Sequence, residues 1–132
     1  MNKLSNTYLR LAIAFALVGV AIGYGMGASE DHTLAPAHAH INLLGWVSMF
    51  LYGLFYRAFP AAAVGLLPNA QLWCAVLGFL IMIPARTIKL LALTDLAAVS
   101  AIGLIVGSTL VVVGMILMAV IIFRATSEKA AA

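Results

Sequence analysis

The stretch APAHAHINLLGW, residues 35–46, opens an apolar segment that continues to about residue 56 and carries two histidines near its start. A helix that crosses a bilayer needs about 20 apolar residues, so this segment is long enough to do so. Ionisable side chains are expensive inside a membrane and commonly mark functional sites. The stretch therefore predicts both a transmembrane helix and a site that uses His38 and His40.

The composition of the whole chain indicates a membrane protein. Of its 132 residues, 65% are hydrophobic and only 8% are charged, whereas soluble domains carry about 25% charged residues. The net charge of +3 comes mostly from residues beside the apolar segments, so it bears on membrane orientation and does not indicate a nucleic-acid partner. The single cysteine, Cys74, excludes an internal disulfide and is expected to be a small buried hydrophobe.

Hydropathy divides the chain into four apolar windows. They cover residues 8–27, 36–56, 70–93 and 96–123, and each is long enough to span. Helices are expected, because lipid satisfies no backbone hydrogen bonds. We therefore predict an all-α, polytopic membrane protein in which residues 1–132 form a single four-helix domain.

The connections between the windows differ in length. The stretch LPN at 67–69 stands before the third window, and only Thr94 and Asp95 clearly separate the third window from the fourth. The last two helices are therefore expected to form a tight hairpin.

The first window has an alternative interpretation as a secretory signal peptide, since basic residues precede its apolar run and small residues end it. Its length favours a retained helix. Gly19, Gly23 and Gly27 repeat at four-residue intervals and clear one helix face for close packing. Gly103 and Gly107 predict the same kind of contact in the fourth helix.

The basic residues predict the orientation. With the N-terminus in the cytoplasm of a bacterium, five of the seven basic residues lie inside and two outside, and three of the four acidic residues lie outside. The expected location is the bacterial inner membrane, with both termini cytoplasmic.

The spacing of the two histidines restricts what they can bind. Residues i and i+2 of a helix point about 200° apart, so His38 and His40 cannot both ligate one haem. If the start of the helix were unwound, both could reach one copper or zinc ion. In a regular helix, Asn42 and Gly45 share the face of His38. Asn42 could orient the imidazole, and Gly45 leaves room for a planar ligand.

Two further cations lie at the same predicted membrane depth as the histidines. Arg86 and Lys89 are three residues apart and share a helix face. They either extend to the outer head groups or bind the carboxylates of a haem. The histidines themselves could simply solvate a helix end. His32 is expected to be an exposed side chain, or else a third metal ligand.

The segment HAHINLLGWVSMFLYGLFYR, residues 38–57, resembles a metal-binding helix of the haem–copper oxidase subunit I superfamily, including its NnrS-type relatives. In that superfamily a His-x-His pair near the outer end of a helix serves two different haems, and basic residues hold the haem propionates. The usual twelve helices form three arcs of four, so this chain corresponds to one arc.

The resemblance implies a homotrimeric ring that rebuilds the twelve-helix layout. One haem b would lie between neighbouring subunits, ligated by His38 of one and His40 of the next, with Arg86 and Lys89 on its propionates. Such a haem would serve electron transfer or redox sensing with a redox partner that the sequence does not identify.

The chain departs from the oxidases at the copper centre. In the active oxidases, one copper-ligand histidine is followed four residues later by a tyrosine. Here the residue four positions after His40 is Leu44, and no second histidine-bearing helix follows. A complete oxidase is therefore not expected. The alternatives are a copper-binding or copper-handling protein, a small haem protein that reacts with NO or O2, and a structural accessory subunit.

Overall fold

The computed structural model describes residues 3–130, with side chains up to residue 127. Within that range every regular element is a helix, as the sequence predicts. The elements are α1 (Lys3–Ser29), α2 (Ala35–His40), the π-helix η1 (Ile41–Ser48), α3 (Met49–Ala58), the 3-10 turn η2 (Pro60–Ala63), α4 (Leu66–Leu90), the 3-10 turn η3 (Thr94–Leu96) and α5 (Ala97–Ala130).

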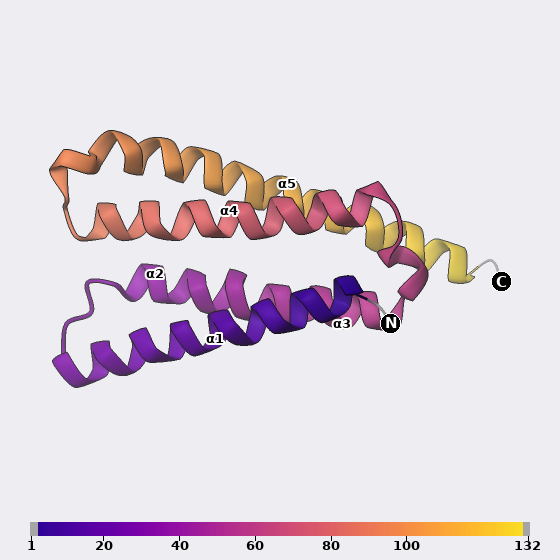
Figure 1. Ribbon diagram of the computed structural model, residues 1–132, viewed down its shortest axis with the longest axis horizontal. Coiled ribbons are helices and arrows are strands. Elements are labelled where there is room, and N and C mark those ends of the chain that lie inside the picture. Colours follow the sequence, from indigo (N-terminus) through magenta and orange to yellow (C-terminus); the bar gives the residue numbers. More distant parts are fainter. Residues whose placement is uncertain (1–2, 131–132) are drawn as a thin grey trace.

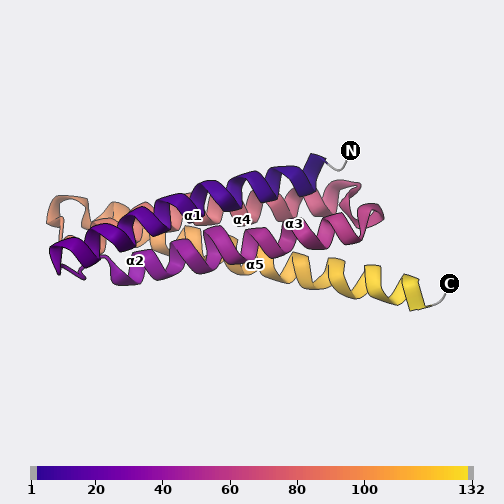
Figure 2. The ribbon, with the colours of Figure 1, turned by 90° about the horizontal axis from the view of Figure 1, so that it is seen from below.

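The helices form two antiparallel hairpins that lie side by side (Figure 1). In one hairpin α1 runs beside the continuous helical path of α2, η1 and α3, and in the other α4 runs beside α5. The turns at 30–34 and 91–96 lie together at one end of the bundle, and the beginning of α1 and the end of α5 lie at the other. Figure 2 shows the last turns of α5 extending past the other helices at that second end.

Three helices are long and apolar enough to cross a membrane: α1, α4 and the stretch Thr94–Ser127, which joins η3 to most of α5. The second apolar window, predicted as one regular helix over 36–56, is helical over 35–58 but changes type twice. The regular helix predicted there is wrong between residues 41 and 48, where the backbone adopts the wider π form. Ser48 Oγ donates to the Leu43 carbonyl at 2.8 Å, which satisfies a backbone oxygen within this wider turn.

The boundaries of α4 also differ from the predicted 70–93. The helix begins at Leu66, so the stretch LPN lies inside it. Pro68 is in the first turn, where the N–H that proline lacks has no intrahelical partner in any case. The helix ends at Leu90, and Ala92 adopts a positive φ of 52°. The following turn is short, which confirms the tight hairpin.

Glycines let α4 and α5 approach closely. A Cβ added to Gly107 would lie 2.6 Å from the Met82 backbone nitrogen, and one added to Gly78 would lie 2.8 Å from the Val111 nitrogen. A Cβ on Gly103 would lie 2.8 Å from the Cβ of Ala85. The predicted packing role of Gly103 and Gly107 is therefore confirmed, because no larger residue fits between these backbones.

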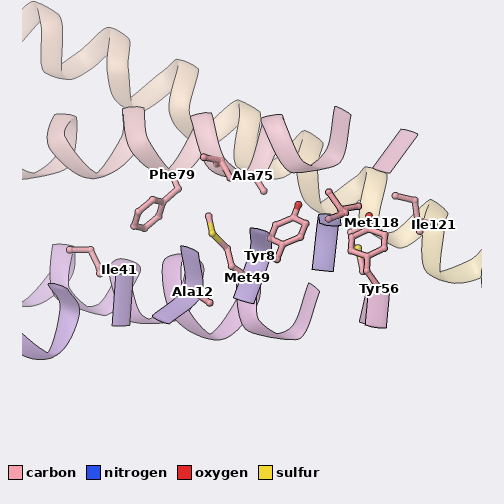
Figure 3. Packing of buried hydrophobic residues seen from close by; sticks show 11 residues of the cluster. Tyr8, Ala12, Ile41, Met49, Tyr56, Ala75, Phe79, Met118 and Ile121 are labelled. Carbon is pink, nitrogen blue, oxygen red and sulfur yellow. The ribbon is translucent and has the colours of Figure 1, made fainter. Parts of the chain in front are cut away.

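The buried core joins the two hairpins (Figure 3). Phe79 of α4 lies against Phe15 of α1, with ring centroids 4.4 Å apart. Met49 lies between the hairpins and is 1% exposed. The outer faces of the helices carry many exposed large apolar side chains, as expected for helices that face lipid.

Candidate functional site

The two histidines occupy the last turn of α2, near the end of the bundle that carries the 30–34 turn. This short helix begins with Pro36 in its first turn, as the sequence indicates. The His38 N–H donates to the Leu34 carbonyl at 2.9 Å, and the Ala35 N–H donates to the His32 carbonyl at 3.0 Å. These bonds anchor the start of the helix, so the histidines sit on ordered backbone.

His38 points toward α1. Its Nδ1 lies 2.9 Å from the carbonyl oxygen of Gly19. Because a carbonyl only accepts, Nδ1 carries the proton and Nε2 carries the lone pair. The Nδ2 group of Asn42 lies 3.1 Å from Nε2 and donates to it. Asn42 thus contacts this imidazole, but at the nitrogen that would bind a metal, whereas the predicted role was to orient the ring through its second nitrogen. The Gly19 carbonyl takes that position instead.

The glycines of α1 provide the space for these two side chains. A Cβ on Gly23 would lie 2.7 Å from His38 Cε1, and a Cβ on Gly19 would lie 2.2 Å from Asn42 Oδ1. Nothing lies within 4 Å of the equivalent position on Gly27. Two of the three glycines predicted to pack against a neighbouring helix thus accommodate the polar side chains of the site.

His40 has a different environment. Its Nδ1 lies 2.7 Å from the Pro36 carbonyl oxygen one turn earlier on the same helix. The proton is therefore on Nδ1, and within the described part of the chain Nε2 has no hydrogen-bond partner. The side chain is only partly buried. His40 therefore presents an oriented nitrogen lone pair.

The two imidazoles do not converge on one ion. His38 bonds across to α1, whereas His40 bonds back along its own helix. His32 is exposed, and its Nδ1 lies 3.1 Å from the Glu30 carbonyl. Among the described residues, no three or more side chains of the types His, Cys, Asp and Glu are grouped so that they could hold a metal ion.

The cations Arg86 and Lys89 lie on α4, at the same end of the bundle as the histidines. Arg86 is partly buried, and its Nε is buried without a hydrogen-bond partner. Lys89 is exposed and borders a cavity of about 240 Å³ between α4 and α5. No hydrogen bond or ion pair joins either cation to a histidine within residues 3–127.

The clearing predicted beside Gly45 is filled from within the chain. A Cβ at Gly45 would lie 2.7 Å from two ring carbons of Phe79 and 3.0 Å from the Cβ of Phe15. The π-helix alters the faces that residues 41–48 share: Gly45 packs against both α4 and α1, whereas Asn42 lies beside Gly19 of α1. The planar group against Gly45 is thus a phenylalanine ring, and we assign this glycine no part in ligand binding.

The structure contains a second, buried polar cluster that was not predicted from the sequence. The hydroxyl groups of Tyr8 and Tyr56 both donate to Gln71 Oε1, the second at 3.2 Å. All three side chains are fully buried, and Gln71 Nε2 has no hydrogen-bond partner among the described residues. The available signal in the sequence was a glutamine within the third apolar window.

No protein-family model, no curated protein and no solved structure matches this chain. The likeness of residues 38–57 to the haem–copper oxidase superfamily therefore stays a prediction from that segment. The chemistry of the site is therefore what indicates a function. That chemistry is two imidazoles that point apart, each with Nδ1 beside a main-chain carbonyl oxygen, at the end of a bundle of apolar helices.

Proposed function

We propose that this chain is a four-span integral membrane protein that binds b-type haem through its histidines. Three helices already have the length and apolarity of membrane spans. Residues 35–58 run helically beside the 27-residue α1, and Arg57 is the only Lys, Arg, Asp or Glu in that stretch. A segment of this length beside a spanning helix supports a fourth crossing.

The observation that carries the proposal is that both imidazoles are held through Nδ1. Each places Nδ1 on a main-chain carbonyl oxygen, at 2.9 Å for His38 and 2.7 Å for His40. Ligating histidines are typically fixed in this manner, because a bond from the second nitrogen sets the tautomer and the ring orientation. Histidines that only solvated a helix end would not require both tautomers to be fixed.

The divergence of the imidazoles supports sites shared between copies of the chain. In the proposed homotrimeric ring, each haem receives His40 from one copy and His38 from the next. His40 already presents its Nε2, whereas His38 fits only if the Asn42 amide turns away from Nε2. The proposal therefore requires this rearrangement of Asn42 before His38 can ligate the haem.

Arg86 supports an anionic group near this end of the bundle. Its Nε is a buried donor without a partner in the described chain, and leaving such a donor unsatisfied is costly. A carboxylate would satisfy it through a charge-assisted hydrogen bond. Haem carries two propionates, and we propose that Arg86 and Lys89 bind them.

A haem with two histidine ligands supplies reversible one-electron chemistry and leaves no open position for a gas. We therefore propose electron transfer or redox sensing with a partner still to be identified. The chain's own contribution is to orient the imidazoles, exclude water with apolar helices and balance the propionate charge. The beginning of α1 and the end of α5 lie at one end of the bundle, and the distribution of basic residues favours the cytoplasmic side of a bacterial inner membrane for that end.

One observation favours a second candidate, a haem protein that reacts with NO or O2. The Nε2 of His38 already accepts a hydrogen bond from Asn42, so His40 alone could ligate the haem. Such a haem would be five-coordinate and open to a gas. Copper remains an alternative, but it would need ligands from neighbouring copies, since no suitable group of three lies within the described residues.

The decisive experiment is a reduced-minus-oxidised visible spectrum of the detergent-purified protein, with pyridine haemochrome quantitation and metal analysis. We expect a sharp α-band, about one haem per chain, and a trimer by light scattering. His38→Ala and His40→Ala should each abolish the six-coordinate spectrum, while His32→Ala is the matched control and should retain it.

The contrary outcomes separate the alternatives. A five-coordinate spectrum that persists in His38→Ala would replace electron transfer with gas chemistry. Stoichiometric copper without a Soret band would replace haem with copper. A protein that holds neither, expressed with adequate haem, would refute the proposal and leave a structural accessory role.

A further inference from the structure

A groove lies at the end of the bundle opposite the histidines. It has a volume of about 570 Å³ and is bordered by the η2 turn, the start of α4 and the last third of α5. Phe59, Leu67 and Ile121 are among its apolar lining residues. The volume is within the range of about 300–1,000 Å³ that holds small-molecule ligands.

Arg124 is the single charged residue in the lining of this groove. It is exposed and lies near the end of α5, where that helix extends past the rest of the bundle. An arginine beside an apolar groove matches a ligand with an anionic head and an apolar tail, because guanidinium binds phosphate oxygens in a bidentate manner.

The charge of this end of the molecule favours an anion. Lys3, Arg10 and Arg57 belong to the same end as Arg124. Glu30, Asp31 and Asp95 all lie in or beside the turns at the opposite end. Glu128, four residues after Arg124, is the only acidic residue in the sequence at this end, and its side chain is outside the described part.

We propose that the groove bounded by η2 and α5 binds an anionic phospholipid. Its phosphate lies on Arg124, and the beginning of an acyl chain lies against Phe59, Leu67 and Ile121. This inference depends on the membrane location in the proposed function but not on haem, since the groove and the histidines lie at opposite ends. Cytoplasmic leaflets are rich in anionic lipid, which agrees with the predicted orientation.

The test is native mass spectrometry of the detergent-solubilised full chain with phosphatidylglycerol, and with phosphatidylcholine as the zwitterionic reference. We expect preferential retention of phosphatidylglycerol. Arg124→Gln should weaken it by about fivefold, the effect of one basic residue at an anionic surface. Arg10→Gln removes the same charge from the same end but outside the groove, and it should leave retention unchanged.

A second variant tests the apolar part without altering charge. Ala125→Leu places a larger side chain in the lining and should also reduce retention. Equal losses in Arg124→Gln and Arg10→Gln would overturn the proposal in favour of general charge attraction. Full competition by inorganic phosphate would likewise overturn it, because the ligand would then be free phosphate. Haem content measured on the same samples separates failure here from failure of the proposed function.

Discussion

The imidazole of His38 occupies the space that a side chain on Gly23 would fill, since a Cβ built there would lie 2.7 Å from His38 Cε1. This contact joins α1 to α2, and the Gly19 carbonyl adds a hydrogen bond to the same ring. The position of the histidine is therefore set by α1 as much as by its own helix. The small residues on α1 are therefore part of the site that holds the ligand candidate on α2.

Gly23→Ala should destabilise the protein and displace His38. Overpacking of a tight contact costs about 1–3 kcal/mol, and we expect a loss of this size in equilibrium unfolding in mixed micelles. Gly27→Ala is the matched control, because its added methyl meets nothing within 4 Å. Alanine there should be neutral or stabilising by up to about 1 kcal/mol. Equal behaviour of the two variants would contradict the placement of the ring.

Tyr8→Phe should weaken the contact between the hairpins. The Tyr8 hydroxyl donates to Gln71 in the buried core, and interhelical hydrogen bonds in membranes contribute about 0.6–1.7 kcal/mol. We expect a loss in this range in the same unfolding assay. Tyr24→Phe removes the same atom from a side chain that is 81% exposed and should change little. A Tyr8→Phe protein as stable as Tyr24→Phe would show that the buried bond is not formed.

Gly107→Ala should separate α4 from α5. The added methyl would lie 2.6 Å from the Met82 backbone nitrogen, and a backbone cannot yield as a flexible side chain does. We expect a destabilisation of at least about 1–3 kcal/mol and a lengthened distance between spin labels on the two helices. Gly25→Ala, which meets no atom within 4 Å, controls for the intrinsic effect of alanine. An unchanged label distance would contradict the close packing.

The turn that leads to the histidines should respond to pH through Asp31. The Thr33 hydroxyl and N–H donate to Asp31 Oδ1 at 2.6 and 2.9 Å, and the hydroxyl bond is the main reason that the pKa of Asp31 is lowered. A lowered folded-state pKa means that the stabilisation is present above the ordinary carboxyl value, about 3.9, and is lost as pH falls through the lowered value.

An NMR titration of the Thr33 amide would measure this transition. We expect a midpoint below about 3.9, and Thr33→Val should raise it because the hydroxyl donor is removed. A midpoint that does not move in Thr33→Val would show that the hydroxyl bond is not the cause.

Much of the architecture follows from hydropathy alone. Long apolar runs in a chain with few charges can satisfy their backbone only as helices, so the all-helical fold and the tight turn near Thr94 were predictable. The divergence of His38 and His40 was also predictable, because side chains two residues apart on a helix point about 200° apart whatever surrounds them. The close approach of α5 to α4 at Gly107 was predictable because glycine has no side chain to separate two helices.

Tertiary contacts decided the rest of the site. Local periodicity could not reveal the π-helix at 41–48, which changes the faces that Asn42 and Gly45 share. It could not show that Phe79 fills the space beside Gly45, since that ring comes from α4. The bond of Gln71 to Tyr8 likewise joins residues 63 positions apart. The sequence thus determined which segments are apolar helices, because that property depends only on the apolar residues within each segment. Only packing between the hairpins determined which polar atoms meet, because those atoms belong to different helices.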